Sequence, residues 1–209
     1  MYDAVKEWVL ETYPEFEEKD ILRPFWPGAD YTKVEYPDGC LVMDNPPWSI
    51  MAAICRWYTN HKINYFLFAN HVTHFSELRI TECHAVVAHA NIRYENGARI
   101  STSFLTNLGP KIRISGELKY RVDNVQGIVK SKRKAYHPSY NIVSGAQLGK
   151  FATAGYNIDL PSAQFEGHDN GYRIFGGGCR LSDDDAKTIK DLQRALEESD
   201  RPTTAGDSA

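Results

Sequence analysis

The residues most able to carry chemistry form one short run, Asp44-Asn45-Pro46-Pro47-Trp48. They follow a few apolar residues that predict a short, buried strand. Because each proline lacks an N–H and restricts the residue before it, the backbone must stay extended as it leaves that strand. We therefore expect the Asn45 side chain and the Pro46 carbonyl to be fixed hydrogen-bond acceptors at a strand's carboxyl end, with the Trp48 ring beside them. Open α/β sheets bind ligands at this edge, although a structural Pro-Pro turn would explain the same residues.

The segments after this run predict the elements that position it. Residues 49 to 60 have apolar side chains at helical spacing, and Ser49 is a candidate N-cap. Residues 63 to 69 predict a second strand that ends at Asn70-His71. Further along, two β-rich runs flank Glu95-Asn96-Gly97, and Asn-Gly between such runs predicts an antiparallel hairpin.

The run Asp-Asn-Pro-Pro-Trp resembles the (Asn/Asp/Ser)-Pro-Pro-(Tyr/Phe/Trp) motif of the S-adenosylmethionine-dependent amino-methyltransferases, which methylate the exocyclic nitrogen of adenine or, less often, cytosine. The order of flanking elements is similar too, as is the Phe-Leu-Thr-Asn-Leu segment at 104–108, so that the resemblance covers roughly residues 20 to 113. It implies that Asn45 and the Pro46 carbonyl accept hydrogen bonds from the target amine while Trp48 stacks on a flipped-out base. Asp44 is then expected to fix the turn rather than to abstract a proton.

The fold implied is α/β, a reduced Rossmann-like methyltransferase sheet with a terminal antiparallel hairpin and a C-terminal helix at about 183–198. Only sixteen positions separate Gly28 from Asp44, whereas one crossover unit takes about 30 residues. Most of the cofactor-binding half is therefore expected to be missing.

Two segments are candidates for the loop that would hold S-adenosylmethionine. The first follows a short predicted strand and runs from Pro24 to Gly28, which a Pro-rich surface loop would equally explain. The second precedes the C-terminal helix and would be the cofactor loop of a circularly permuted enzyme. The residues assigned to cofactor binding are Phe25, Gly28, Phe175, Gly176, Gly177 and Gly178.

Candidate substrate contacts lie in two other places. The resemblance puts the loop after the second strand beside the target base, which makes His71 and Phe75 candidates. We otherwise expect His71 and His74 to be solvated, because no cysteine or carboxylate completes a metal site. Residues 109 to 150 are basic with interleaved tyrosines, a pattern typical of nucleic-acid contact but also of an ordinary solvated face. The candidates there are Lys130, Lys132, Arg133 and Lys134.

Composition limits the remaining possibilities. A net charge of −3 over 209 residues argues against a generally basic nucleic-acid coat. No long apolar span and no signal-peptide pattern is present, so we expect a cytoplasmic protein without a membrane segment. Its four scattered cysteines predict buried free thiols. We expect one domain over 1–200 and a flexible tail over 201–209.

The leading functional hypothesis is methyl transfer from S-adenosylmethionine to an adenine N6 in DNA. Such small, reduced forms resemble those that phages and mobile elements carry. One alternative is a nucleic-acid-binding relic that keeps the base pocket but has lost the cofactor. The other is half of a split enzyme in which a second subunit supplies the cofactor site.

Overall fold

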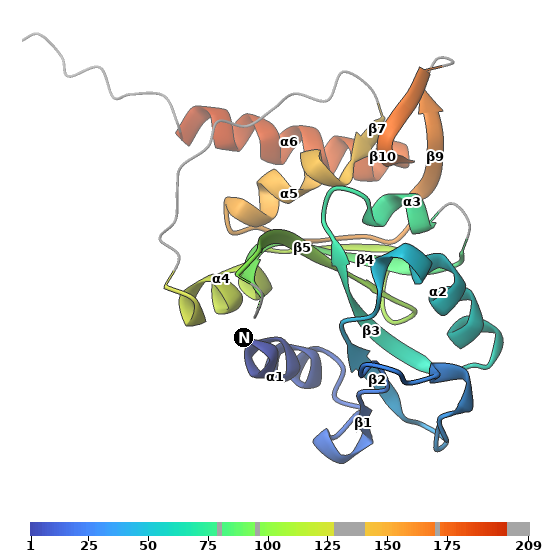
Figure 1. Cartoon of the computed structure of the whole chain (residues 1–209). Coiled ribbons are helices and arrows are strands. Elements are labelled where there is room, and N and C mark those ends of the chain that lie inside the picture. The colour runs from blue at the N-terminus through green and yellow to red at the C-terminus, as the bar shows by residue number, and fades with distance from the viewer. Residues whose placement is uncertain (79–80, 95–96, 128–140, 170–171, 200–209) are drawn as a thin grey trace, which may run out of the picture.

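The computed structural model describes residues 1–78, 81–94, 97–127, 141–169 and 172–199, and is built around a seven-stranded mixed sheet (Figure 1). The strand order is β1-β2-β3-β5-β4-β6-β8, in which β5 and β8 run antiparallel to their neighbours. The other five strands are parallel to one another, so their carboxyl ends meet at one edge. The strands are β1 (Ile21–Leu22), β2 (Leu41–Asp44), β3 (Asn64–Asn70), β4 (His84–Arg93), β5 (Arg99–Thr106), β6 (Ile112–Ser115) and β8 (Asn157–Leu160).

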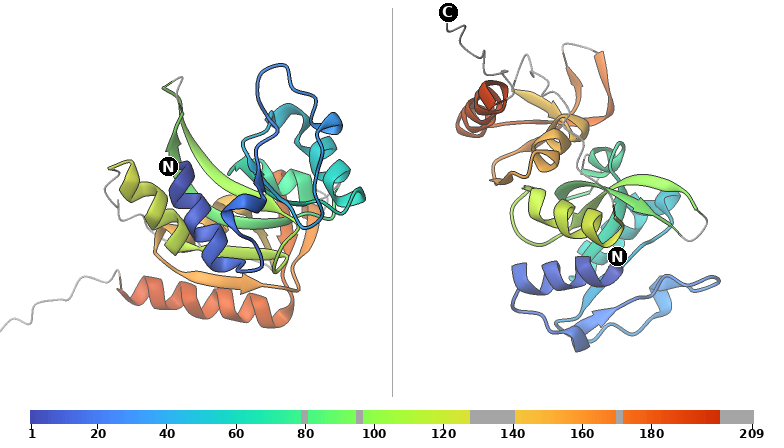
Figure 2. Two further views of the ribbon diagram at one scale, coloured as in Figure 1. Left: turned by 90° about the horizontal axis from the view of Figure 1, so that it is seen from below. Right: turned by 90° about the vertical axis from the view of Figure 1, so that its left-hand side faces the viewer.

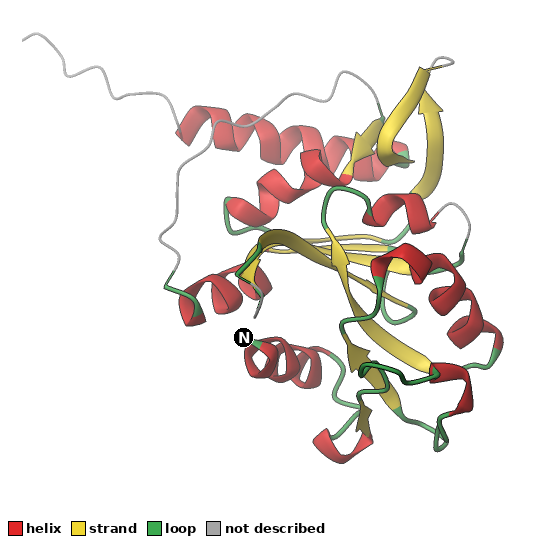
Figure 3. Ribbon diagram, viewed as in Figure 1, coloured by secondary structure: helices red, strands yellow, loops and turns green. Residues whose placement is uncertain are grey.

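Helices cover both faces of this sheet (Figure 3). One face packs against α1 (Tyr2–Thr12) and α4 (Gly116–Val125), which lie side by side in Figure 2. The other face packs against α2 (Met51–Asn60), α3 (His74–Leu78) and α5 (Gly145–Thr153). Because side chains alternate along a strand, β2 sends Leu41 and Met43 to the first core and Val42 to the second. Three short 3₁₀ helices, η1 (Glu18–Asp20), η2 (Tyr31–Lys33) and η3 (Trp48–Ile50), lie in the connections.

The C-terminal part forms a second, three-stranded antiparallel sheet, followed by a helix. Its order is β7 (Ile142–Ser144), β10 (Tyr172–Arg180), β9 (Gln164–Asp169). The predicted C-terminal helix is confirmed as α6 (Asp183–Ser199), and the Ser182 hydroxyl accepts a hydrogen bond from the Asp185 N–H at 3.2 Å, as expected of its cap.

The predicted antiparallel hairpin is confirmed, but it does not end the sheet. Strands β4 and β5 pair from Arg93↔Arg99 onward, with the turn glycine Gly97 at φ +83°. However, β5 inserts between β3 and β4, and the sheet continues through β6 and β8. Sequence analysis missed these two strands because each has only four residues, too few for a clear alternating pattern.

At the opposite edge, β1 has two residues and pairs only with β2 in the described part of the chain. The connection from β1 to β2 contains η2 and loop, without the crossover helices and strands of a complete nucleotide-binding half. The expectation that the interval from Gly28 to Asp44 is too short for them is thus confirmed.

Two further expectations concern the cysteines and the presence of a membrane-spanning helix. All four cysteines are buried and free, as predicted. Among the described helices we find none with the length and apolar character needed to cross a membrane.

Candidate functional site

Asp44 fixes the turn at the carboxyl end of β2, as predicted. The residue is only 3 % exposed. Its Oδ2 accepts a hydrogen bond from the Phe25 N–H at 2.8 Å, and its Oδ1 accepts one from the Asn45 N–H at 2.9 Å. A buried carboxylate that accepts two backbone hydrogen bonds is a structural anchor. Asp44 therefore ties the segment after β1 to the start of the Pro-Pro run.

The Pro-Pro run presents an unused polar group to solvent. Asn45 is exposed while Pro46 is buried. Neither the Asn45 side-chain amide nor the Pro46 carbonyl has a hydrogen-bond partner within the described ranges.

Helical structure begins directly afterwards, at Trp48, so Ser49 is not the N-cap that we predicted; Ile50 takes that position in α2.

The Trp48 ring is held in one orientation by contacts with a residue of β3 and with a residue directly after β4. Its Nε1–H donates to the Phe68 carbonyl of β3 at 3.1 Å. The Tyr94 ring, at the end of β4, contacts it edge-on with centroids 6.1 Å apart and an interplanar angle of 82°. Tyr94 is itself hydrogen-bonded to Thr102 Oγ1 at 3.3 Å. The ring is thus fixed without a ligand, while part of its surface remains accessible.

Arg23, a cation that sequence analysis did not identify, lies at the same edge of the sheet. Arg23 Nε is 3.6 Å from Asp44 Oδ1, and the guanidinium carbon lies 4.2 Å from the centroid of the Tyr2 ring. The Tyr2 hydroxyl donates to the Met43 carbonyl at 3.0 Å, and burial raises its pKa to about 12, so the ring stays neutral and fixed. No local pattern could reveal this arrangement, because α1, β1 and β2 are distant in sequence.

The first predicted cofactor segment does not form a cradle. The Phe25 amide bonds to Asp44, and its ring packs against Tyr31 and Tyr58 at centroid distances of 5.5 and 6.4 Å. Gly28 has φ +84° and completes an exposed turn in which the Ala29 N–H bonds to the Trp26 carbonyl at 3.0 Å. Glycine is needed there for the turn itself.

The second predicted cofactor segment is a strand, so the expectation of a glycine-rich loop was wrong. Phe175, Gly176, Gly177 and Gly178 all lie within β10. Gly177 has φ +79°, and a Cβ there would lie 2.8 Å from the Phe165 ring and 3.1 Å from the Phe75 backbone. The glycine at 177 therefore serves packing of β10 against α3 and β9.

The predicted substrate contacts after β3 are core residues, and the expectation of solvated histidines was wrong. His71, His74 and Phe75 are 2 %, 1 % and 1 % exposed. The two histidines are covered by α5, where two glycines one turn apart make room for them. A Cβ at Gly149 would lie 2.6 Å from His71 Nε2, and one at Gly145 would lie 2.6 Å from His74 Cε1.

His71 belongs to a buried polar cluster around an irregularity in β4. Between Val86 and Ala90 the strand bulges opposite Ser103, and His89 adopts φ +53°. Ser103 Oγ accepts hydrogen bonds from the N–H groups of Ala88 and His89 at 3.3 and 3.2 Å. Its own hydrogen is therefore available for His71 Nδ1, 2.8 Å away, which leaves the proton of neutral His71 on Nε2. Burial lowers the pKa of His71 to about 2 and that of His74 to about 4.

The basic stretch contributes little free positive charge in its described part. Lys111 donates to the Cys83 carbonyl at 2.8 Å, and Arg113 pairs with Asp159 at 2.8 Å. Lys119 is buried and pairs with Asp123 at 2.7 Å. These cations support the fold. Lys130, Lys132, Arg133 and Lys134 lie outside the described residues.

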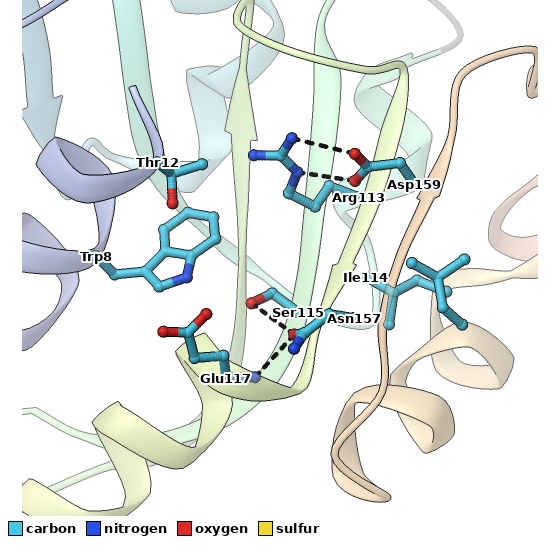
Figure 4. Close-up of a pocket in the computed structure, with 9 residues that line it drawn as sticks. Trp8, Thr12, Arg113, Ile114, Ser115, Glu117, Asn157 and Asp159 are labelled. Atoms are coloured by element: carbon cyan, nitrogen blue, oxygen red, sulfur yellow. Dashed lines mark hydrogen bonds and ion pairs between the residues drawn. The ribbon is translucent and has the colours of Figure 1, made fainter. Parts of the chain in front are cut away.

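A pocket of about 310 Å³ lies between α1, β6, β8 and the start of α4 (Figure 4). Arg113 and Asp159 pair along one wall, and Asn157 Oδ1 accepts the Glu117 N–H at 3.0 Å. Three strands separate β6 from β2 in the sheet order, so this pocket is distinct from the Pro-Pro edge. With its polar groups paired to one another, it selects no class of ligand.

In the described ranges, no group of three or more histidine, cysteine or acidic side chains could hold a metal ion. Comparisons with protein-family models, curated proteins and solved structures found no match for this chain. A proposal about its function must therefore be argued from the geometry at the carboxyl end of β2.

Proposed function

We propose that this chain binds an unpaired adenine of DNA at the carboxyl end of β2, in the manner of the DNA adenine N6-methyltransferases. Two observations at this run together carry the proposal: the exposed Asn45 amide has no hydrogen-bond partner among the described residues, and the Trp48 ring is already fixed by its bond to the Phe68 carbonyl. A base that has left the helix requires hydrogen-bond acceptors for its amine and a flat ring on which it can stack.

Each residue of the run has a distinct part in this proposal. Asn45 Oδ1 and the Pro46 carbonyl accept hydrogen bonds from the adenine N6 amine, and Trp48 stacks on the base. Asp44 keeps the two acceptors in place through its bonds to backbone N–H groups. Because the Trp48 ring is already fixed by its contacts with Phe68 and Tyr94, little of its conformational freedom is lost when the base enters.

The residues present do not fit the methyl donor that the resemblance implies. S-adenosylmethionine would supply the methyl group, yet the Phe25 amide is occupied by Asp44 and Gly28 belongs to an exposed turn. Residues 175–178 form a strand instead of a loop. We therefore derive no transfer step for the isolated chain.

Two versions of the proposal differ in the fate of the base. In the first, the chain alone methylates adenine N6. In the second, it binds nucleic acid without transfer, or transfers only with a second subunit that supplies the donor site. The two-residue edge strand β1, without a further strand beside it in the described ranges, favours the second version.

Substitution of the pocket residues tests the base-binding proposal. Trp48→Ala and Asn45→Ala should each weaken binding of a single-stranded oligonucleotide that contains one adenine, and Trp48→Ala should cost about 1–3 kcal/mol from lost stacking. Ser49→Ala, in the next exposed position, is the matched control. Unchanged affinity in both pocket variants, with circular dichroism showing intact folding, would return the motif to a structural turn.

Calorimetric titration with S-adenosylmethionine separates the two versions. A chain without a donor site should show a Kd near 1 mM or weaker, whereas a self-sufficient enzyme should reach about 1 μM, a difference of about 4 kcal/mol. Micromolar binding together with methyl incorporation into adenine would establish the first version. Weak binding that a second protein restores would establish the split enzyme.

A further inference from the structure

We propose that the loop after β1 forms a second subsite, in which Arg23 and Trp26 hold the nucleotide that flanks the adenine at Asn45. This inference rests on the base-binding function proposed above and adds a phosphate contact and a stacking contact to it. The same loop was expected to hold a cofactor, but its backbone is engaged with Asp44 instead.

Arg23 is an exposed cation that lies beside Asp44, the residue directly before Asn45. Its position is fixed by the Tyr2 ring beneath the guanidinium and by Asp44 beside Nε, while 59 % of its side chain remains exposed. The contact with Asp44 is made through Nε, and the two terminal nitrogens make no hydrogen bond to the described residues. The separation of 3.6 Å between Arg23 Nε and Asp44 Oδ1 is longer than a hydrogen bond, so this ion pair does not engage the terminal nitrogens of the guanidinium. A planar guanidinium with two outward N–H groups matches the geometry of a phosphate.

Trp26 provides an exposed aromatic surface close by. It follows Phe25, the residue whose amide bonds to Asp44, and 57 % of it is exposed. The turn that starts at Trp26 is closed by the Ala29 N–H and requires the positive φ of Gly28, which fixes the backbone. Phe25 packs against the core, whereas most of the Trp26 side chain faces solvent. The Trp26 ring therefore adds little to the stability of the fold.

The apolar surface along this edge extends beyond Trp26. In the described part of the chain five large apolar side chains are strongly exposed, and three of them follow β1, β2 and β3: Trp26, Ile50 and Val72. The carboxyl ends of these parallel strands meet at one edge, where Asn45 and Trp48 also lie. Proteins bind single-stranded nucleic acid with aromatic rings on which bases stack and with cations that pair with phosphates, and Trp26 and Arg23 supply one of each. This combination favours a nucleotide over an isolated carboxylate as the occupant.

Equilibrium binding of adenosine and of a short single-stranded oligonucleotide with one central adenine tests the subsite. Trp26→Ala should weaken oligonucleotide binding about 5- to 150-fold, the range for one lost base–aromatic stack. Arg23→Gln should reduce the slope of log affinity against log salt by about 0.7, the value for one phosphate contact on a single strand. Adenosine, which has no flanking nucleotide, should bind both variants as it binds the wild type.

Matched controls separate the subsite from general effects. Lys33→Gln removes an exposed cation that pairs with Asp30 in the same connection, and Tyr120→Ala removes an exposed ring on α4; neither should change oligonucleotide binding. Equal affinity and equal salt slope in the Arg23 and Trp26 variants, while Trp48→Ala still weakens binding, would overturn the subsite and leave the base pocket intact. Loss of adenosine binding in either variant would show that no separate subsite exists. Weaker binding of S-adenosylmethionine by Arg23→Gln without an effect on DNA would assign the loop to the cofactor, and a wild-type chain that binds no oligonucleotide would refute both proposals.

Discussion

The buried histidines after β3 predict a steep loss of stability in mild acid. His71 and His74 are almost completely buried, and burial lowers their pKa values from 6.5 to about 2 and about 4. The groups nearest His71, namely His74, His89 and Lys119, lower its pKa further because they are themselves basic. Both imidazoles therefore stay neutral in the folded protein at pH 5, whereas they are protonated in the unfolded chain.

The sign and size of the effect follow from proton linkage. Where the unfolded state binds more protons, the free energy of unfolding falls as pH falls, here below about 6.5. Each histidine contributes about 1.4 kcal/mol per pH unit in that range, so lowering the pH from 7 to 5 should cost about 2 kcal/mol per histidine and about 4 kcal/mol for the two. Domains are usually stable by only about 5–15 kcal/mol, so this is a large share.

Urea denaturation of the wild type at pH 7 and pH 5 measures this difference directly. The midpoint should fall by about 2 M for an m-value near 2 kcal/mol/M. His71→Gln and His74→Gln should each lower the difference between the two pH values by about 2 kcal/mol, whatever their stability at pH 7. His61→Gln is the control, because His61 is exposed.

A wild-type protein equally stable at the two pH values would refute the buried, neutral state of these histidines. The same conclusion would follow if both glutamine variants kept the full pH dependence. In that case the acid sensitivity would belong to other groups.

Three further predictions concern side-chain packing and pairing within the fold. Gly149→Ala should lower the free energy of unfolding by about 1–3 kcal/mol despite its better helix propensity, because the new Cβ would overlap His71; thermal melting measures the loss. Lys119→Met should cost about 3–5 kcal/mol in urea titrations by leaving Asp123 buried without its partner, and replacing both residues by apolar ones should recover much of it; an additive double variant would contradict the pairing. Trp48→Phe, which removes the indole N–H bond to a β3 carbonyl, should cost about 0.5–1.5 kcal/mol of stability, and an unchanged melting temperature would argue that this bond does not fix the ring.

Local patterns predicted the elements that carry the Pro-Pro run. The buried strand β2, the helix α2 and the hairpin of β4 and β5 each have a signal within a few neighbouring residues: an apolar run, helical spacing, and Asn-Gly. The role of Asp44 as an anchor followed from the same reasoning. The two prolines restrict the backbone whatever the rest of the fold does.

The errors share a different cause, contact between segments distant in sequence. Residues 71–75 look like a polar loop, but α5 and β10 cover His71, His74 and Phe75, and glycines on those two elements provide the space. Lys119 and Arg113 look like a nucleic-acid footprint until their partners Asp123 and Asp159 are known. Residues 175–178 look like a phosphate loop although they lie within β10, which pairs with β7 and β9 on either side of a register irregularity between Arg173 and Gly178. No sequence pattern pointed to Arg23, because it contacts Tyr2 and Asp44 only in the folded chain.

Recognition of the adenine N6 amine is the central claim, and one comparison tests it most directly. Two single-stranded oligonucleotides should be titrated that differ only in one base, adenine in the first and purine, which lacks the 6-amino group, in the second. The ring remains for Trp48 to stack on, so any difference reports the hydrogen bonds to Asn45 and the Pro46 carbonyl. We expect adenine to bind about 1–3 kcal/mol more tightly, and Asn45→Ala to lose a large part of that difference. Equal affinity for the two oligonucleotides, or a difference that persists in full in Asn45→Ala, would contradict the account.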